Sequence, residues 1–190
     1  MPEVVVRPVT PSRWDDLERL FGPNGAYANC WCMWWRMPSK DFDRAGGPAK
    51  RRALKEFTER RTIPGLLAYR AGEPVGWVSV APREEFGRIE RSRVLARVDD
   101  RPVWSIVCFY IPRGHRGRGV GKALLEGALE HVRSRGGGLV EAYPIDTSDG
   151  RLPSADIYTG TLRMFEAAGF REVARRGRRP IVRRRVRGRR

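Results

Sequence analysis

Long apolar runs are missing from this sequence. No stretch of the 190 residues reaches the roughly 18 consecutive apolar residues that a membrane-spanning helix needs. The first residues, Met1–Val4, include neither the basic segment nor the apolar segment of a secretory signal. We therefore expect a cytoplasmic protein without a membrane partner.

Cysteine and histidine are also scarce. The three cysteines are an odd number, and Cys30 and Cys32 are too close in sequence to bridge easily, so no disulfide framework is expected. A Cys-x-Cys pair with distant histidines is one way to bind a metal ion, but the chain has only His115 and His131. His115 lies in a glycine-rich turn that predicts a different role. The sequence thus favours reduced thiols and no bound metal.

Lysine is rare, whereas arginine is abundant. The chain has 38 Lys and Arg residues against 22 Asp and Glu residues, which gives a net charge of +16. Residues 171–190 hold eleven arginines and one glutamate. A basic end of this kind attracts nucleic acid or an acidic partner in some proteins, and in others it is only a solvated end. We favour the solvated end and leave a nucleic acid partner open.

The length fits one domain with a core of its own. Apolar periodicity and turn residues indicate alternating strands and helices along it. The expected strands are Val4–Val9, Gly65–Tyr69, Pro74–Val80, Val103–Ile111, Leu139–Tyr143 and Ile181–Val186. The expected helices follow Thr10 or Ser12, cover Ala49–Arg61, run from Val120 to the stop at Gly136, and cover Tyr158–Ala168.

A glycine-rich turn separates a strand from a helix at residues 116–121. The strand Val103–Ile111 is nearly all apolar or β-forming, which is typical of a strand buried on both faces. Gly117, Gly119 and Gly121 have no side chain, so an anion can approach the unpaired N–H groups at the start of the helix. The turn therefore predicts a pyrophosphate site.

Two other kinds of glycine loop do not fit these residues. A P-loop needs Gly-Lys-Ser/Thr, but Gly121 and Lys122 are followed by Ala123, so no hydroxyl is available for magnesium. A dinucleotide-binding loop needs a different glycine spacing and an acidic residue about twenty positions further on. Neither feature is present in the sequence.

The turn Arg116-Gly117-Arg118-Gly119-Val120-Gly121 resembles the Q/R-x-x-G-x-G/A signature of the GNAT superfamily of N-acetyltransferases. Leu162–Phe170 is similar to the L-Y-x-x-x-G-F ending of that family, and the order of elements in residues 4–80 is similar to its N-terminal half. The resemblance implies one α/β (α+β) domain over residues 1–186, with a mixed, mostly antiparallel sheet flanked by helices. Residues 187–190 would form an Arg-rich tail.

The resemblance also implies an acetyl-CoA-dependent N-acetyltransferase in which an amine attacks directly in a ternary complex. The pyrophosphate of acetyl-CoA would lie on the glycine turn, and the pantetheine arm would pair with the edge of the preceding strand. No metal is implied. The implied cofactor-binding residues are Phe109, Tyr110, Ile111, Arg116, Gly117, Arg118, Gly119, Val120, Gly121, Lys122 and Phe165.

The sequence departs from the family where the leaving thiolate would be protonated. The family's usual tyrosine falls on Phe165, which has no proton to donate. Tyr158, seven residues earlier and two helical turns away on the same face, is our candidate acid. Glu141 is the candidate base, with an exposed strand residue as the alternative. We expect Cys108 to be a small core residue rather than a nucleophile.

An aromatic cluster at residues 30–36 has two interpretations. Its rings either pack in the core or surround the acceptor, because the family builds acceptor specificity largely between its first and second strands. The candidate acceptor-binding residues are Trp31, Trp34, Trp35 and Arg36. Aromatic walls favour an apolar or cationic acceptor, and Arg36 is suited to fix a carboxylate. The amine stays open between a small molecule and a protein, and a homodimer is one option for the assembly.

Two rival functions stay open at this point. The Arg-rich end suits a nucleic-acid or ribosome-associated binding module in which the tail does the binding. Phe165 suits a GNAT fold that binds CoA without turnover.

Overall fold

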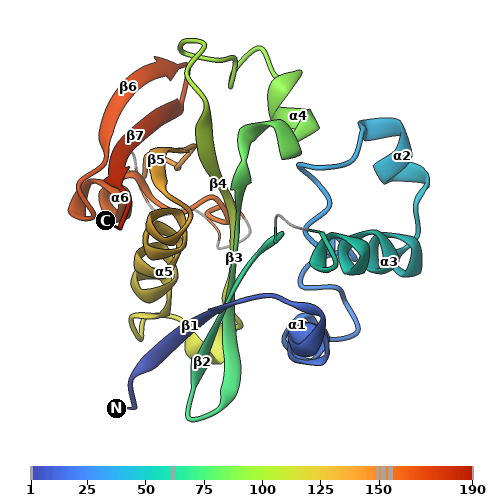
Figure 1. The fold of residues 1–190 in the computed structure, drawn as a ribbon. Coiled ribbons are helices and arrows are strands. Elements are labelled where there is room, and N and C mark those ends of the chain that lie inside the picture. The colour runs from blue at the N-terminus through green and yellow to red at the C-terminus, as the bar shows by residue number, and fades with distance from the viewer. Residues whose placement is uncertain (1, 61–62, 149, 151–152, 154–155, 190) are drawn as a thin grey trace.

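The strands form one seven-stranded mixed sheet in the order β1-β2-β3-β4-β5-β7-β6 (Figure 1). The structure is a computed structural model, and it describes residues 2–60, 63–148, 150, 153 and 156–189. β4 and β5 run parallel, and the other neighbouring pairs are antiparallel. The sheet confirms the expected fold, a single α/β domain with a mixed, mostly antiparallel sheet flanked by helices.

The elements follow one another with few long connections. The strands are β1 Val4–Pro8, β2 Gly65–Arg70, β3 Glu73–Pro82, β4 Val103–Tyr110, β5 Gly137–Ala142, β6 Arg171–Arg176 and β7 Arg179–Arg187. The α-helices are α1 Trp14–Phe21, α2 Ser39–Arg44, α3 Gly47–Thr58, α4 Gly87–Glu90, α5 Val120–Ser134 and α6 Leu162–Ala167. Short 3-10 turns cover Pro11–Arg13, Arg83–Glu85 and Arg113–His115.

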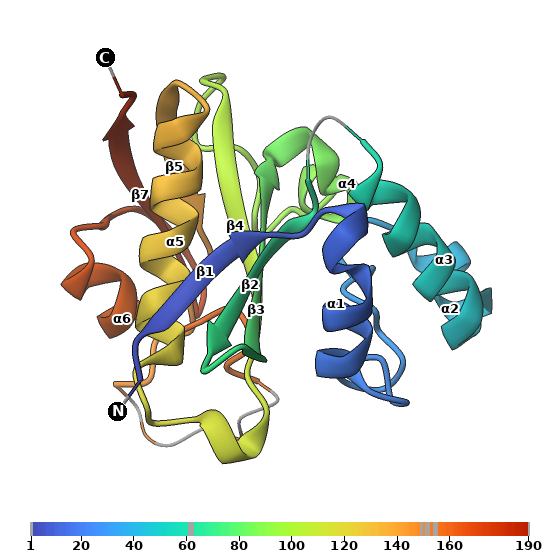
Figure 2. The same cartoon turned by 60° about the horizontal axis from the view of Figure 1, so that its bottom comes forward.

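The helices cover both faces of the sheet, as Figures 1 and 2 show. α5 crosses one face, and α1 and α3 lie over the other. The apolar residues of α5 recur every three or four positions, so one stripe of this helix is buried against the strands. The opposite face has an aromatic core that includes Trp14, Phe21, Trp31 and Trp77. The helix that follows the predicted cofactor turn therefore packs on one face of the sheet, and part of the aromatic cluster packs on the other face.

β4 and β5 separate halfway along β4. Their pairing begins at Val103 with Leu139 and ends at Ile106 with Ala142, while β4 continues to Tyr110. Beyond the last pair, the N–H of Phe109 donates to the carbonyl oxygen of Tyr158 at 2.6 Å. The divergence leaves room beside the C-terminal half of β4.

The predicted helix over Tyr158–Ala168 is too long. The observed helix α6 begins at Leu162, after Gly160 adopts a left-handed φ of +82° and the Thr161 hydroxyl accepts from the N–H of Met164. Tyr158 thus lies in a turn before the helix. The argument that Tyr158 and Phe165 share a helical face is wrong, although the two residues are still near one strand.

The Arg-rich end contributes more to the sheet than we expected. β7 lies inside the sheet, between β5 and β6. It extends to Arg187, which pairs with Gly137, so this residue of the predicted tail belongs to the sheet. Residue 190 lies outside the described residues, as does residue 61 at the predicted end of the helix that is observed as α3.

Candidate active site

The glycine turn leads directly into α5. Gly117 and Gly119 have left-handed φ angles of +69° and +79°, which favour glycine, and a methyl group at either position would meet no other atom within 4 Å. The guanidinium of Arg70 donates to the carbonyl of Arg118 at 2.7 Å and holds the turn against β2. The space in front of the turn is therefore open.

The first turn of α5 keeps its N–H groups available. Gly119 is the N-cap, no side chain caps the helix, and no acidic residue lies in its first turn. These N–H groups and the positive end of the helix dipole suit an anion such as pyrophosphate. Exposed side chains of Arg116, Arg118 and Lys122 surround the turn and add positive charge.

A cavity of about 820 Å³ opens on the face of the sheet that carries α1. Its walls are largely aromatic, with rings from Tyr27, Trp34, Trp35, Phe42, Trp77 and Tyr158. The end of β4 also lines it, through Phe109, Tyr110 and Ile111, and so does Arg116 at the start of the glycine turn. One cavity thus connects the predicted pantetheine edge with part of the predicted acceptor cluster.

The cavity does not include all of the predicted acceptor residues. Trp31 is buried in the core and stacks on Trp14 with 6.3 Å between ring centroids. Arg36 points inward, where its guanidinium lies 4.5 Å from the ring centroids of both Phe57 and Phe86. The aromatic cluster is therefore divided. Trp34 and Trp35 line the cavity, whereas Trp31 and Arg36 are buried and are not among its lining residues. Arg36 is not among the residues that line this cavity, so its placement does not favour the predicted role of fixing a carboxylate of the acceptor.

Glu141 lies in a buried ion-pair network and does not line the cavity. Its two carboxylate oxygens accept from Arg83 and Arg183, each at 2.7 Å, and the Tyr143 hydroxyl donates to one of them at 2.6 Å. The side chain is 1% exposed, so the alternative of an exposed strand residue is also wrong. Both oxygens are occupied by these donors and the side chain is outside the cavity, so this placement does not favour the predicted role as base.

Phe165 occupies the core rather than the cavity wall. It is fully buried, and its ring packs edge-on against Phe109 at 6.2 Å and Phe170 at 5.0 Å. Its ring contact with the predicted cofactor edge is made with the Phe109 side chain.

Tyr158 lines the cavity and faces Trp35, with 6.4 Å between the ring centroids. Burial raises the pKa of its hydroxyl to about 12. The hydroxyl is therefore protonated at neutral pH and has a proton to donate. The structure brings this candidate acid to the same cavity as the β4 edge, from a turn rather than from the predicted helix.

Three thiols that sequence reasoning did not assign to the site also line the cavity: Cys30, Cys32 and Cys108. The Trp77 indole N–H donates to the Cys32 sulfur at 3.1 Å. The neighbouring Cys108 thiol lowers the pKa of Cys32 to about 7, while the pKa values of Cys108 and Cys30 are raised. The sequence signal for Cys30 and Cys32 was a Cys-x-Cys pair inside an aromatic cluster, and Cys108 had no such signal.

The segment around Cys32 is strained. Ala28, Asn29, Trp31 and Cys32 all have left-handed φ angles between +48° and +55°, which are unfavourable for residues other than glycine. Each such residue costs on the order of 1 kcal/mol, and strain of this kind concentrates at functional sites.

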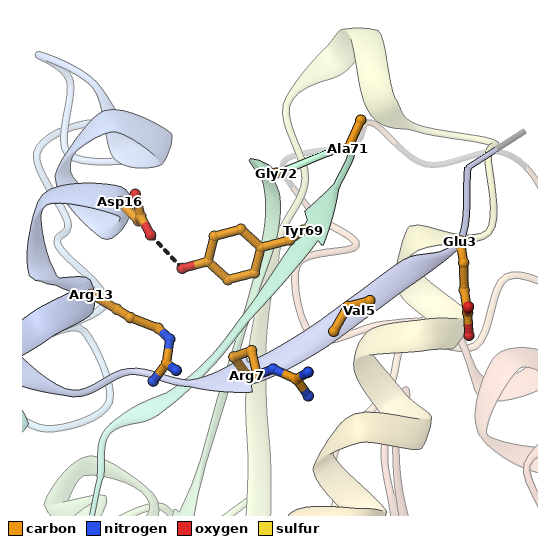
Figure 3. Close-up of a pocket in the computed structure, with 8 residues that line it drawn as sticks. All are labelled: Glu3, Val5, Arg7, Arg13, Asp16, Tyr69, Ala71 and Gly72. Carbon is orange, nitrogen blue, oxygen red and sulfur yellow. Dashed lines mark hydrogen bonds between the residues drawn. The ribbon is translucent and has the colours of Figure 1, made fainter.

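A second, smaller cavity of about 370 Å³ lies between β1, α1 and the β2–β3 turn (Figure 3). The Tyr69 hydroxyl donates to Asp16 at 2.6 Å, and Arg13 donates to the carbonyl of Pro8 at 3.1 Å. Because these polar groups are already paired with the protein, we assign no chemistry to this cavity.

The described residues include no group of three or more His, Cys, Asp or Glu side chains placed to hold a metal ion. In the same part of the chain, none of the helices has the length and apolar character to cross a bilayer.

Comparisons with solved structures show the same fold at low sequence identity. A Corynebacterium glutamicum protein described as a histone acetyltransferase HPA2 and related acetyltransferase superposes with a TM-score of 0.57 at 19% identity, over 96% of each chain. A GNAT family acetyltransferase from Streptococcus pneumoniae gives 0.55 at 15% identity, over 97% of this chain and 99% of that one. The PaiA N-acetyltransferase of Thermoplasma acidophilum, in complex with coenzyme A, gives 0.55 at 12%, over 96% and 99%.

None of the curated proteins matches the chain. The family model described as the Acetyltransferase (GNAT) family matches residues 30–161, which include the aromatic cluster, β4, the glycine turn and α5. The chain therefore belongs to the GNAT family of acetyltransferases.

Proposed function

We propose that this protein transfers an acetyl group from acetyl-CoA to an amine by direct attack in a ternary complex. The observation that supports the proposal most is the single cavity, lined both by the end of β4 beside the glycine turn and by an aromatic pocket. A donor on the β4 edge and an acceptor among the rings would meet without a carrier between them. Proximity of this kind supplies much of the rate of an enzymatic transfer.

The glycine turn is suited to hold the donor. The open space at Gly117 and Gly119 and the uncapped start of α5 fit a pyrophosphate group. The pantetheine arm would run along the separated half of β4, as an added strand does. There the N–H of Phe109 is already paired with Tyr158, so an arm that used this group would displace the Tyr158 carbonyl.

The aromatic pocket indicates an acceptor amine on an apolar body. Among the described residues no carboxylate lines the cavity, and its only charged lining residue is Arg116. Rings such as Trp34 and Tyr27 stack on apolar groups and attract cations through their faces. The acceptor is thus an amine on an apolar body, either a free molecule or the end of a protein side chain. Its binding does not depend on an ion pair with a carboxylate of the cavity wall.

Tyr158 is the proposed acid for the leaving thiolate. Its hydroxyl is protonated at neutral pH and lies in the same cavity as the β4 edge. Tyr158 does not need to transfer its proton completely, because the thiolate of a thiol with a pKa of about 8.5 is a fair leaving group by itself.

The experiment is an acetyl-CoA consumption assay over a panel of apolar amines, combined with calorimetry of CoA binding to two variants. Aspartate tolerates a left-handed φ, so Gly119→Asp should fold while placing a negative charge in the anion site. We expect its Kd for CoA to rise about 100-fold, which corresponds to about 2.7 kcal/mol.

Gly114→Asp is the matched control, because it makes the same charge change in open space before the turn. Its Kd should rise much less. Equal losses in the two variants would place the pyrophosphate elsewhere. CoA binding by the wild type without transfer to any amine would refute the enzyme activity and favour a CoA-binding fold without turnover.

A further inference from the structure

The cavity lacks the usual groups that accept a proton from an amine. An aliphatic amine is protonated at neutral pH and attacks only after it has lost a proton. Among the described residues, neither a carboxylate nor an imidazole lines the cavity. Glu141 is paired with two arginines outside it. The remaining titratable groups on the wall are thiols, phenols and the guanidinium of Arg116.

Cys32 stands apart from the other two thiols because its sulfur is surrounded by donors and positive charge. On β3, the Trp77 N–H donates to it at 3.1 Å and the Ser79 hydroxyl lies beside it. On β4, the Cys108 thiol lies close enough to lower the pKa of Cys32. The positive charge of Arg36, four residues further along the same segment, also lowers the pKa of Cys32.

The charge of Arg36 is fixed in place. Its guanidinium lies between the rings of Phe57 and Phe86 and donates to the carbonyl of Pro64 at 3.2 Å. Burial lowers the pKa of Arg36 to about 10, so the group still carries its charge at neutral pH. Glu85 pairs with it at 3.4 Å. These contacts keep a cation near the Cys32 sulfur, which favours a thiolate there.

We propose that the Cys32 sulfur is the general base that takes the proton from the attacking amine, a proposal that rests on the proposed acetyl transfer. The amine nitrogen forms a bond to the thioester carbonyl carbon, and the bond from that carbon to the CoA sulfur breaks. The ammonium group loses one proton to Cys32 before it attacks, and the CoA sulfur receives a proton from the Tyr158 hydroxyl as it leaves. The second proton on the nitrogen, which is lost as the amide forms, returns to the Tyr158 phenolate, and Cys32 releases its proton to solvent, so both residues return to their starting states.

The opposite pKa shifts of Tyr158 and Cys32, which line the same cavity, support this assignment. The pKa of Tyr158 is raised to about 12, whereas the pKa of Cys32 is lowered to about 7. A pair of titratable groups whose pKa values are pushed apart is how active sites separate an acid from a base. The two lie close enough for the thiols to contribute to the high pKa of Tyr158.

A base fits the position of Cys32 better than a nucleophile does. The residue is 6% exposed, and its sulfur already accepts from the Trp77 indole N–H. An acyl carbon must reach a nucleophile directly, but a proton can reach a base through one bridging water. The burial therefore favours proton transfer.

The test compares Cys32→Ser and Cys32→Ala with the matched variant Cys30→Ser from the same Cys-x-Cys pair. The thiolate absorbance of the full chain is titrated in the ultraviolet, and kcat/KM is measured against pH with one apolar amine. We expect the wild type and Cys30→Ser to show a thiolate that forms near neutral pH, and both Cys32 variants to lose it. CoA binding, measured by calorimetry, should persist in all four proteins.

In the kinetics, Cys32→Ser should lower kcat/KM at pH 7 by about 10² to 10⁴, the usual contribution of a general base. The difference should shrink toward about pH 10, where the free amine is deprotonated by solvent. Wild-type turnover that survives Cys32→Ser at pH 7 would overturn the base and leave the proposed function intact. An acetylated Cys32 that forms with acetyl-CoA alone and then reacts with amine would assign a nucleophile instead. No turnover by the wild type would refute the proposed function itself.

Discussion

Glu141 shows how the neighbours of a buried residue decide its role. Its carboxylate joins β5 to Arg83, in the 3-10 turn that follows β3, and to Arg183 on β7. Arg183 also pairs with Asp99 at 2.6 Å. A charge placed this deep is stable only while its partners remain, because a buried ion has no water to replace them.

At this scale we predict that Glu141→Gln destabilises the fold. Glutamine keeps the shape but leaves the buried guanidinium groups of Arg83 and Arg183 without their shared carboxylate. Removal of one partner from a buried pair costs about 3–5 kcal/mol, and urea denaturation measures the loss. Glu126→Gln on α5 is the control. That side chain is 61% exposed, and its ion pair with Lys122 is long, at 3.8 Å. It should change stability by less than about 0.5 kcal/mol. Equal losses of stability in the two variants would show that the buried ion pairs of Glu141 do not stabilise the fold more than an exposed pair does.

The sequence placed Glu141 on a strand but could not show what it faces. Arg83 and Arg183 are 58 and 42 residues away, and 34 arginines are too many for composition to reveal which turn inward. Tyr158 was assigned to the site by a helical argument that proved wrong, although the residue does line the cavity. The glycine turn was easier to predict, because its requirement for bare backbone appears in the residue types themselves.

At the scale of elements, α5 packs directly on β1 through Gly127. A methyl group at this position would lie 2.5 Å from a methyl carbon of Val6 and 2.7 Å from its Cβ. Distances this short require one of the two elements to move. Gly127 therefore allows the close approach between the helix and the first strand.

We predict that Gly127→Ala lowers stability although alanine is the better helix former. The higher helix propensity of alanine is worth about 1 kcal/mol, whereas overpacking costs about 1–3 kcal/mol, so a net loss of up to about 2 kcal/mol is expected. Thermal unfolding of the single variant and of Val6→Ala/Gly127→Ala measures it. The double variant should recover only part of the loss, because the Cβ of residue 6 remains in the way. A stabilised single variant would show that β1 moves freely.

Elements with a strong local pattern were predicted well, and the others were not. β4 and α5 carry an apolar run and an apolar stripe, and both were found close to their observed bounds. β6 was missed because Arg171–Arg176 has almost no apolar alternation, and its pairing with β7 is a tertiary effect. The helix at Tyr158 was overextended because the left-handed Gly160 stops it from the N-terminal side.

At the scale of the whole molecule, positive charge exceeds negative charge by 16. Some of the arginines are neutralised inside the fold, as Arg83 and Arg183 are, but many others lie on the surface. A polyanionic donor such as acetyl-CoA approaches a protein of this kind through an attractive field. That field is weakened by salt over a Debye length of about 8 Å at physiological ionic strength.

We therefore predict that the association rate of CoA depends on salt, while its dissociation rate does not. Steering of this kind changes kon by about 10-fold or more, and stopped-flow binding over a series of salt concentrations measures it. Pantetheine without its phosphates is the ligand control, and its kon should be nearly constant. Arg185 and Arg187 are exposed on β7, outside the glycine turn and the cavity, so Arg185→Glu/Arg187→Glu tests the field by charge alone. This double variant should bind CoA more slowly at low salt and like the wild type at high salt. If salt instead acts on koff alone, direct contacts at the turn carry the attraction, because a long-range field guides the ligand only before it binds.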